Sequence, residues 1–527
     1  MMRIRIEHPC IYLDPKGTKT NCLLIEDGKI VSTGAKALLG SVDRVERPEG
    51  KCVMPGLIDS HIHLWGLGLR AGSVNLRGAK STQEVYGRLA GARPVGGWVL
   101  GKDWDQNLWS DGRELSREVL DELFPGTPVS LRRIDGHACW VNSEALRRAV
   151  ISDSWKPPAG GDAWREGGIS TGRLNGCLVD DAMRPIEAIM PPETEHDDLA
   201  TYLESARLLR SFGITGAHKA WMPVNRLPML ERLRDSDRLG LRLHLLFDCN
   251  DTHLGSLLER GPWADDWISA RGIKYFADGA MGSRGAALLD NYKDTDHPGL
   301  VVETPETMNR DIPKYAALGW QIAVHAIGDR GAQNVLDAFE KIPAEDRANT
   351  RPRLEHAQML DDRNLARFSE LSVIASLQPI HLHSDAAWID EALSQEQLRR
   401  LFRWRDLASS TRVSGGSDYP IEDPNPWHGI SVAVTRQHAG GQVFHVEQCL
   451  TRTEAIALYT TDAAFAGFAE NVVGRLEAGF FADFCVLNTD PFLASPEEIW
   501  DTQCLGTYLN GQLAWAPTKV SGHHPNL

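Results

Sequence analysis

Short apolar runs recur through the middle of the chain, and longer stretches with apolar residues at helical spacing lie between most of them. Short apolar runs bounded by turns are typical of buried strands, and the longer stretches predict amphipathic helices. Strands that alternate with helices form parallel βαβ units. We therefore predict eight strands, over Leu57–His63, Ile214–Lys219, Leu241–Asp248, Gly272–Asp278, Trp320–His325, Arg353–His356, Val373–Gln378 and Arg412–Asp418.

Eight such units predict a closed barrel, in which parallel strands form the inner cylinder and helices form an outer ring. Helix-length stretches between the predicted strands include Asp197–Phe212, Gly331–Lys341, Asp361–Glu370 and Ser394–Arg403. The predicted fold class is α/β, with a (β/α)8 TIM-like barrel domain over residues 57–467.

A large insertion follows the first predicted strand. About 150 residues separate this strand from the second, which is far more chain than one crossover connection needs. The inserted residues, about 65–195, contain two strand-like runs, Trp98–Leu100 and Pro128–Leu131. Because loops that follow barrel strands lie on the active-site face, we expect the insertion to cap the active site.

Both ends of the chain have short strand-like runs separated by turn sequences such as Asp27-Gly28 and Asn510-Gly511. Chain termini often lie close together in folded domains. We therefore predict a small composite β-sandwich built from residues 1–56 and 468–527.

Composition limits the classes of partner. The chain has 527 residues and a net charge of -15, which argues against binding to nucleic acid or to an anionic membrane. We find no apolar run of the roughly 18 residues that span a bilayer, and no apolar core of a signal peptide. The nine cysteines are scattered and include no Cys-x-x-Cys. We expect a cytoplasmic protein.

Side chains that bind metals follow several predicted strands. His61 and His63 end the first strand, and their imidazoles project together because alternate residues of a strand face the same side. Histidine and aspartate suit divalent cations such as zinc, and the active-site residues of a barrel converge at the C-terminal ends of its strands. The predicted metal ligands are His61, His63, Lys274, His325, His356 and Asp418.

Each of these residues has a structural alternative when it is considered alone. A histidine such as His325 or His356 is commonly a hydrogen-bonded core residue. Asp418 also fits an Asx turn or a helix cap, and Lys274 fits a lysine that extends along an apolar surface to reach water. Their joint occurrence in the order of the strands favours one shared site.

Lys274 suits a metal centre only as a neutral or modified amine. Burial and nearby positive charge lower the pKa of a lysine and favour its neutral form. A neutral amine can take up carbon dioxide as a carbamate, which is an anionic oxygen ligand able to bridge two metal ions. The sequence therefore permits a modified lysine as a ligand.

These residues, in this order, resemble the amidohydrolase superfamily in its binuclear branch with a carboxylated lysine. The chain is most similar to the amidohydrolase-3 (YtcJ-like) branch, which includes N-substituted formamide deformylase. The resemblance covers nearly the whole chain. Its supporting stretches are Met54–His63, Gly101–Trp109, Asp135–Leu146, Ile273–Arg284, Val324–Asp329, Leu354–His356, Gln378–Pro379 and Gly416–Pro420.

The resemblance implies two divalent metal ions, with zinc expected, and carboxylated Lys274 as their bridging ligand. It implies cleavage of a non-peptide, amide-type carbon–nitrogen bond by a metal-bridging hydroxide, with Asp418 as general base and then general acid. Lys219 is the alternative bridging lysine, in a run where many relatives carry His-Asp. We favour Lys274 because it lies in a Lys-x-x-x-Asp-Gly run that resembles the branch.

Other residues are candidates for contact with the substrate. His137, in the insertion, is expected to polarise the substrate carbonyl or to hydrogen-bond the substrate, with a structural loop histidine as the alternative. Tryptophan is also a packing residue, and arginine also serves in structural ion pairs. The weaker candidates are Trp104, Asp105, Trp109, Asp278, Arg284 and Gln378.

Two other functions are open at this point. One is a mononuclear deaminase or cyclic-imide hydrolase of the same superfamily, in which Lys274 would not bind metal. The other is a catalytically inactive scaffold protein, which predicts missing ligands, whereas all six positions are filled here. We expect a small-molecule substrate, and the resemblance suggests a homodimer.

Overall fold

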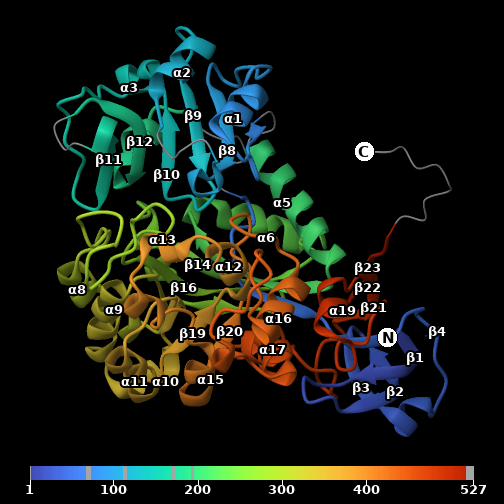
Figure 1. The fold of residues 1–527 in the computed structure, drawn as a ribbon. Coiled ribbons are helices and arrows are strands. Elements are labelled where there is room, and N and C mark those ends of the chain that lie inside the picture. Colours follow the sequence, from blue (N-terminus) through green and yellow to red (C-terminus); the bar gives the residue numbers. More distant parts are fainter. Residues whose placement is uncertain (1, 67–72, 111–114, 169–171, 192–194, 518–527) are drawn as a thin grey trace.

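The computed structural model describes residues 2–66, 73–110, 115–168, 172–191 and 195–517. At its centre eight parallel strands neighbour one another in chain order, and a ninth strand, β15 (Trp263–Ala264), pairs antiparallel with the fourth of them (Figure 1). Most residues of these strands are buried, as expected for a parallel sheet covered by helices. The strands are β6 (Leu57–Ile62), β13 (Ile214–Met222), β14 (Arg242–Asp248), β16 (Ile268–Phe276), β17 (Gln321–Ala326), β18 (Arg353–His356), β19 (Ile374–Leu377) and β20 (Val413–Gly415).

Backbone hydrogen bonds join the ends of the first and eighth strands, where predicted metal ligands lie. The Asp418 N–H donates to the His61 carbonyl oxygen with an N···O distance of 2.8 Å, and the His63 N–H donates to the Tyr419 carbonyl oxygen at 2.8 Å. Gly416 permits this approach, because a Cβ at its position would lie 2.4 Å from the His61 backbone nitrogen. The sheet is therefore a nearly closed barrel.

The α/β class and the parallel barrel agree with the prediction, and each of the eight predicted strands overlaps an observed one. The bounds differ at several ends. The fourth barrel strand, β16, begins at Ile268 rather than at Gly272, and β20 ends at Gly415 rather than at Asp418. Asp418 itself lies after its strand, in a backbone conformation with a φ of 59°, far from the negative φ of regular strands.

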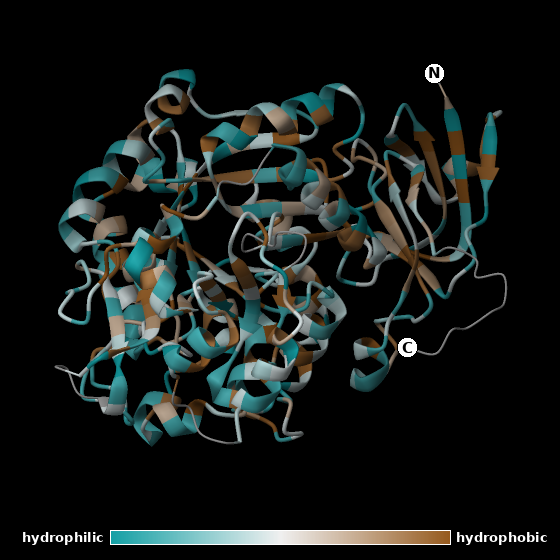
Figure 2. Ribbon diagram, turned by 90° about the horizontal axis from the view of Figure 1, so that it is seen from above, coloured by the Kyte–Doolittle hydropathy of each residue, from teal (hydrophilic) through white to brown (hydrophobic). Residues whose placement is uncertain are grey.

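Helices cover the outside of the barrel, and along them hydrophilic and hydrophobic segments alternate (Figure 2). Three predicted helices are present as α5 (Glu195–Ser211), α9 (Asp329–Glu340) and α11 (Asp362–Glu370). The others that follow barrel strands include α6 (Leu227–Asp235), α7 (Leu254–Arg260), α8 (Pro305–Ala317), α10 (Ala344–Thr350), α12 (Pro379–Asp385), α13 (Ile389–Ala392), α15 (Trp404–Ser410), α16 (Pro426–Thr435), α17 (Arg452–Leu458) and α18 (Thr461–Ala466).

The helix predicted over Ser394–Arg403 is wrong beyond its first turn. Helix α14 (Gln395–Leu398) begins with a capping box at Ser394 and is then interrupted. Leu401 pairs with the strand-like residue Met359, and Phe402 has a positive φ of 52°. The helix ends here because residues 400–402 form backbone hydrogen bonds with the segment that follows β18, from Leu360 N–H to Arg400 and from Phe402 N–H to Gln358.

The insertion forms a separate six-stranded sheet above the barrel (Figure 1). The two predicted runs overlap β8 and β9, each beginning one residue before its strand, whereas the other strands were not predicted. Fifteen buried side chains, including Trp104, Trp109 and Trp140, form a core of its own. Its elements are β7 (Val74–Asn75), α1 (Thr82–Leu89), β8 (Val99–Trp104), α2 (Arg117–Leu123), β9 (Val129–Arg133), β10 (Ala138–Val141), α3 (Ser143–Arg148), β11 (Gly161–Arg165), β12 (Leu174–Asp180) and α4 (Arg184–Glu187).

The two chain ends build one sheet beside the barrel (Figure 1). Strand β21 (Phe484–Leu487) pairs with β5 (Cys52–Pro55), which joins the C-terminal strands to the N-terminal ones. The predicted separation into a two-layered sandwich stays a prediction, and residues 518–527 lie outside the described residues. The remaining strands are β1 (Arg3–Tyr12), β2 (Lys19–Glu26), β3 (Lys29–Thr33), β4 (Arg44–Glu46), β22 (Cys504–Leu509) and β23 (Gln512–Trp515), and helix α19 (Pro496–Trp500) precedes β22.

Among the described residues, no helix has both the length and the apolar character needed to cross a bilayer.

Candidate metal centre

The predicted metal ligands come from five different barrel strands and meet at one end of the barrel. They line a single cavity of about 1270 Å³. His356 and Asp418 have φ values of 73° and 59°, a backbone region that residues with side chains rarely adopt and that is concentrated at functional sites. The structure therefore brings together His61, His63, Lys274, His325, His356 and Asp418.

The closest contacts within this group surround Asp418. Its Oδ1 atom lies 3.1 Å from His63 Nε2 and 3.4 Å from His61 Nε2. The imidazole centroid of His356 lies 4.9 Å from that of His61 and 4.5 Å from that of His325. The potential ligand atoms of His61, His356 and Asp418 lie within 4.8 Å of one another.

The imidazoles of this site are held neutral. Burial, followed by nearby positive groups, lowers the pKa of His61, His63, His325 and His356 well below the usual value. A neutral imidazole is the form that binds a metal ion. The electrostatic environment therefore suits coordination rather than ion pairing.

Several buried polar atoms of the site have no hydrogen-bond partner among the described residues. They are His61 Nε2, His356 Nδ1, Lys274 Nζ and Asp418 Oδ1. A buried polar atom without a partner is costly, and a cluster of them indicates a missing ligand or ion. The donor set of nitrogen and carboxylate oxygen fits a divalent metal such as zinc.

Lys274 and Lys219 are both buried, but only Lys274 lines the cavity. The ammonium or amine group of Lys219 donates to the Trp221 carbonyl oxygen. The Nζ atom of Lys274 has no partner among the described residues, and burial lowers its pKa to about 8. This difference favours Lys274 as the residue that would be modified.

A carboxylate from the neighbouring strand orients His61. Nδ1 of His61 donates to Glu355 Oε2 at 2.6 Å, which leaves Nε2 facing the cavity. Arg353 pairs with Glu355 at 2.8 Å and also donates to the carbonyl oxygen of Ser60 at 2.7 Å. Arg353 and Glu355 are fully buried, so this network connects β18 to β6 directly beneath the site.

We expect Glu355→Gln to weaken zinc binding by about 10–100-fold, because the amide can still accept the hydrogen bond but lacks the charge that increases the basicity of His61. The zinc dissociation constant, measured by competition with a chelator on the folded protein, checks this. The matched variant Glu470→Gln breaks another arginine–glutamate pair, with Arg351, and should leave zinc binding unchanged. Unchanged zinc affinity in a folded Glu355→Gln protein would contradict the orienting role.

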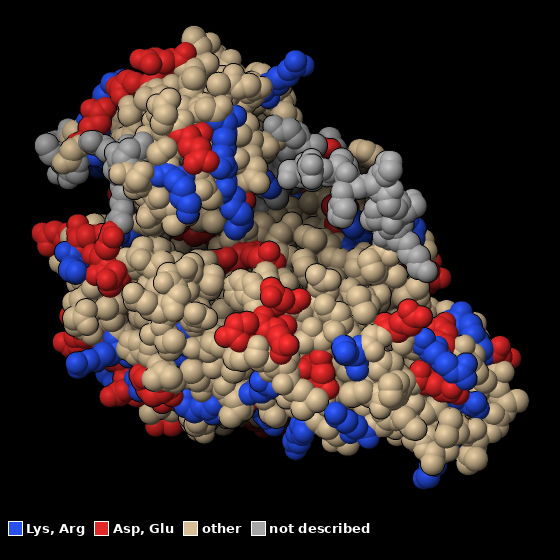
Figure 3. Space-filling model, turned by 45° about the vertical axis from the view of Figure 1, so that its right-hand side comes forward, with Lys and Arg blue, Asp and Glu red and all other residues tan. Residues whose placement is uncertain are grey.

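The insertion supplies the opposite wall of the cavity, and Figure 3 shows a hollow between the two parts with charged side chains beside it. His137 lies on this wall, with its ring centroid 5.0 Å from that of His325. Its Nδ1 atom donates to Asp180 at 2.6 Å. Burial lowers the pKa of His137, but Asp180, with Asp135 and Asp278, acts in the opposite direction and the net pKa is raised.

The six weaker candidates are dispersed. Asp278 lines the large cavity, and its carboxylate accepts the backbone N–H groups of three loop residues. Asp105 lines a smaller adjoining cavity and pairs with Arg133 at 2.6 Å.

The other four candidates have structural contacts. The Trp104 indole donates to the Leu131 carbonyl oxygen, and both Trp104 and Trp109 pack in the insertion core. Arg284 forms an ion pair with Asp294. Gln378 donates to the Ser376 carbonyl oxygen, and its Oε1 atom has no partner among the described residues.

His381 was not predicted, although it lies at the site. It belongs to α12, which follows β19, and its Nε2 atom lies 3.6 Å from Asp418 Oδ2. Its ring centroid lies 5.8 Å from that of His356. The prediction considered only residues at strand ends. His381 lies in the first turn of the helix that follows the seventh strand, so it was missed. Asp180, the partner of His137, has no comparable signal in the sequence.

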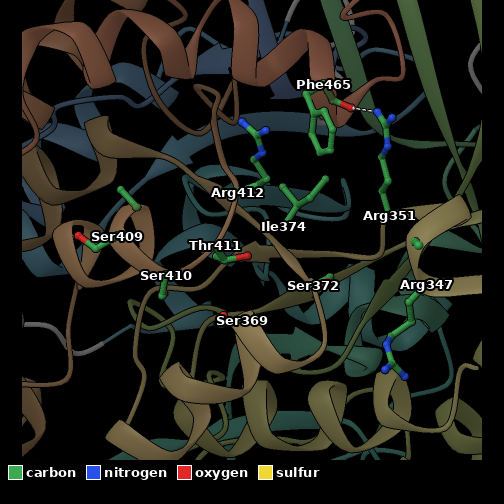
Figure 4. Close-up of a pocket in the computed structure, with 12 residues that line it drawn as sticks. Arg347, Arg351, Ser369, Ser372, Ile374, Ser409, Ser410, Thr411, Arg412 and Phe465 are labelled. Carbon is green, nitrogen blue, oxygen red and sulfur yellow. Dashed lines mark hydrogen bonds between the residues drawn. The ribbon is translucent and has the colours of Figure 1, made fainter. Parts of the chain in front are cut away.

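A second cavity, of about 600 Å³, lies near the N-terminal ends of β18, β19 and β20 (Figure 4). Arg351 in its wall donates to the Phe465 carbonyl oxygen and pairs with Glu470. None of the predicted site residues lines this cavity. Since catalytic residues of a barrel lie at the opposite ends of its strands, we assign no catalytic role to it.

Comparison with known proteins gives concordant results. The sequence model of a protein family described as the amidohydrolase family matches residues 49–514 of this chain. YtcJ of Bacillus subtilis, named as a candidate amidohydrolase, is 33% identical over 95% of this chain and 97% of its own. N-substituted formamide deformylase of Arthrobacter pascens is 26% identical over 96% of this chain and 97% of its own. The structure of an uncharacterised metal-dependent hydrolase from Pyrococcus horikoshii superposes with a TM-score of 0.75 at 26% identity, covering 94% of this chain and 99% of the other.

Proposed function

Because the chain belongs to the amidohydrolase family, whose model matches residues 49–514, we propose that it hydrolyses a non-peptide, amide-type carbon–nitrogen bond of a small molecule. One observation supports this most. The buried Lys274 has a lowered pKa and no partner for Nζ among the described residues, and it shares a cavity with the other five predicted ligands, which are four histidines and Asp418. A lysine in that position is explained by conversion to a carbamate that serves as an anionic ligand.

We assign the ligands to two adjacent positions. His61, His63 and Asp418 would hold one divalent ion, and His325 and His356 would hold the other, with the Lys274 carbamate shared between them. Nε2 of His325 donates to the Gly279 carbonyl oxygen at 3.3 Å, which leaves Nδ1 for coordination. Zinc is the metal expected from this donor set. When bound, the ions would lower the pKa of a shared water toward about 7 and polarise the substrate carbonyl.

The side chains of the site would then move the proton. Asp418 accepts it as the water oxygen bonds to the carbonyl carbon. Asp418 then delivers the same proton to the nitrogen as the carbon–nitrogen bond breaks, and the products are a carboxylic acid and an amine. Oδ1 is the Asp418 oxygen near His61 and His63, and Oδ2 lies 3.6 Å from His381 Nε2, so we assign the transferred proton to Oδ2. His137, on the insertion, would donate a hydrogen bond to the substrate carbonyl.

Metal analysis combined with an activity panel tests the proposal. We expect the purified protein to hold two metal ions per chain and to release amine from N-formyl and N-acetyl amines. Chelation should abolish this release, and added zinc should restore it. Full activity in metal-free protein, or no hydrolysis of any amide by metal-loaded protein, would overturn the proposal.

The mononuclear alternative predicts a different metal content. A deaminase or cyclic-imide hydrolase would be fully active with one ion per chain and would not need the carbamate. The panel therefore includes an amino-substituted heterocycle and a cyclic imide, with ammonia release and ring opening as readouts. Activity confined to these compounds at one metal per chain would favour that alternative.

A further inference from the structure

A small recess of about 80 Å³ adjoins the metal centre on the side of His381. It shares the walls formed by His137, His325, His356 and Asp418 with the large cavity, so both spaces meet at the site. Part of its remaining wall is apolar, including the buried Met281 and Trp388. A short aliphatic group could therefore enter the recess without losing favourable contacts.

Carboxylates outnumber cations in this recess. Besides Asp418, four carboxylates line it, but only one guanidinium, that of Arg133. Arg133 is already engaged, because it pairs with both Asp105 and Asp135. The remaining two carboxylates are Asp385 and Glu422.

The wall of the recess contains no lysine and one arginine, Arg133, which is already paired. Asp385 and Glu422 therefore lack a free lysine or arginine partner there. Asp385 accepts a hydrogen bond from the Gln358 amide at 2.9 Å, which is a neutral donor. Burial raises the pKa of Asp385 to about 7, and burial together with the nearby Asp385 raises that of Glu422 to about 8. A cation placed between them would stabilise their ionised forms.

His381 gives a second, independent indication of a ligand. The residue is only 9% exposed, and it lines the recess. Its Nε2 atom has no hydrogen-bond partner among the described residues. An imidazole nitrogen without a proton can accept a hydrogen bond from an N–H group.

We propose that this recess binds a short alkylammonium group of the substrate, held by Asp385, Glu422 and His381. The inference rests on the proposed function, since it makes the preferred substrates amides that carry a second, positively charged amine. An ammonium group has several N–H donors and a positive charge, which matches two carboxylates and a neutral imidazole. The apolar wall near Trp388 would pack against the methylene groups.

Binding of matched small molecules to the zinc-loaded, full-length protein tests the recess directly. Propylammonium and 1-propanol have the same heavy-atom skeleton and differ in charge. We expect propylammonium to bind at least about tenfold more tightly by calorimetry, which is the effect of one hydrogen bond between charged groups. The double variant Asp385→Asn/Glu422→Gln should lose this preference, since its amides keep the shapes but not the charges.

A charge-matched control distinguishes an effect of the recess carboxylates from an effect of the protein's total negative charge. Asp390→Asn/Glu396→Gln removes two charges from exposed positions in α13 and α14, outside the recess. It should keep the full preference for propylammonium. If the recess variant kept the preference as well, or if wild-type protein bound both molecules equally, the inference would be wrong.

A substrate pair separates failure of this inference from failure of the proposed function. N-acetyl-1,3-diaminopropane should have a higher kcat/KM than N-acetylbutylamine, and the recess variant should remove the difference. If neither amide is hydrolysed but propylammonium binding still depends on the recess, the proposed function fails and the cation site stands. If both amides are hydrolysed equally well by wild-type protein, the proposed function stands and the recess inference fails.

Discussion

Lys274→Ala is expected to reduce the metal content below two ions per chain and to lower kcat/KM by at least about 10³-fold, because the charge stabilisation supplied by the metal centre is worth several kcal/mol. Lys274 is completely buried and is the only one of the predicted ligands that is cationic when unmodified. Metal analysis by mass spectrometry and amide hydrolysis under carbon-dioxide-saturated buffer check the two effects.

Lys219→Ala is the matched control for this experiment. Lys219 is also buried and burial also lowers its pKa, but its Nζ atom donates to the Trp221 carbonyl oxygen. This variant should keep two metal ions. If the two variants behave in the opposite way, with Lys219→Ala losing metal and Lys274→Ala unaffected, the bridging ligand is Lys219.

A third readout distinguishes loss of a ligand from general damage to the fold. Removing the Lys274 side chain leaves room beside the other ligands for a small carboxylate. Added acetate or propionate should therefore restore part of the metal content and activity of Lys274→Ala. Restoration would not occur if the substitution acted only by destabilising the barrel.

Asp418→Asn is expected to lower kcat by about 10²–10⁴-fold, which is the usual contribution of a general acid–base residue. The amide has the shape of the carboxylate and its oxygen can still face His61 and His63, but it cannot accept the proton of water. The metal content should therefore stay near two ions per chain. Steady-state kinetics and metal analysis on one preparation check both statements.

Asp423→Asn is the control for Asp418→Asn, because Asp423 lies in the same loop and is exposed. It should have wild-type kcat. Retention of wild-type kcat by Asp418→Asn itself would remove this residue from the proton transfer and would make His381 or His137 the next residue to test.

The barrel, and the clustering of the predicted ligands at one of its ends, could be predicted from the sequence because both depend on local patterns. Buried parallel strands are continuous apolar runs, and the predicted ligands lie at their ends. An apolar run that ends in a histidine or an aspartate therefore indicates both a strand and a candidate site residue. His61, His325 and His356 illustrate this, since each lies in the last few residues of its predicted strand. The order of these residues along the chain also carried the family resemblance.

Contacts that depend on tertiary packing could not be predicted in the same way. Glu355 precedes His356 in β18, yet its partner is His61, which lies 294 positions away in the sequence. Trp104 lies in a stretch that supports the family resemblance, but its indole packs inside the insertion. Strands β10 and β11 are four and five residues long, and each pairs with β12, which is a contact that their own sequence pattern does not specify.

The insertion leaves and re-enters the barrel between β6 and β13, which are paired neighbours. It has a hydrophobic interior separate from that of the barrel, and it contributes one whole wall of the cavity. An insertion with an interior of its own can change in sequence without repacking the barrel, so this wall of the cavity can diverge separately from the strand ends that carry the predicted ligands. Exchanging the insertion between relatives is therefore expected to change that wall while leaving the predicted ligands in place.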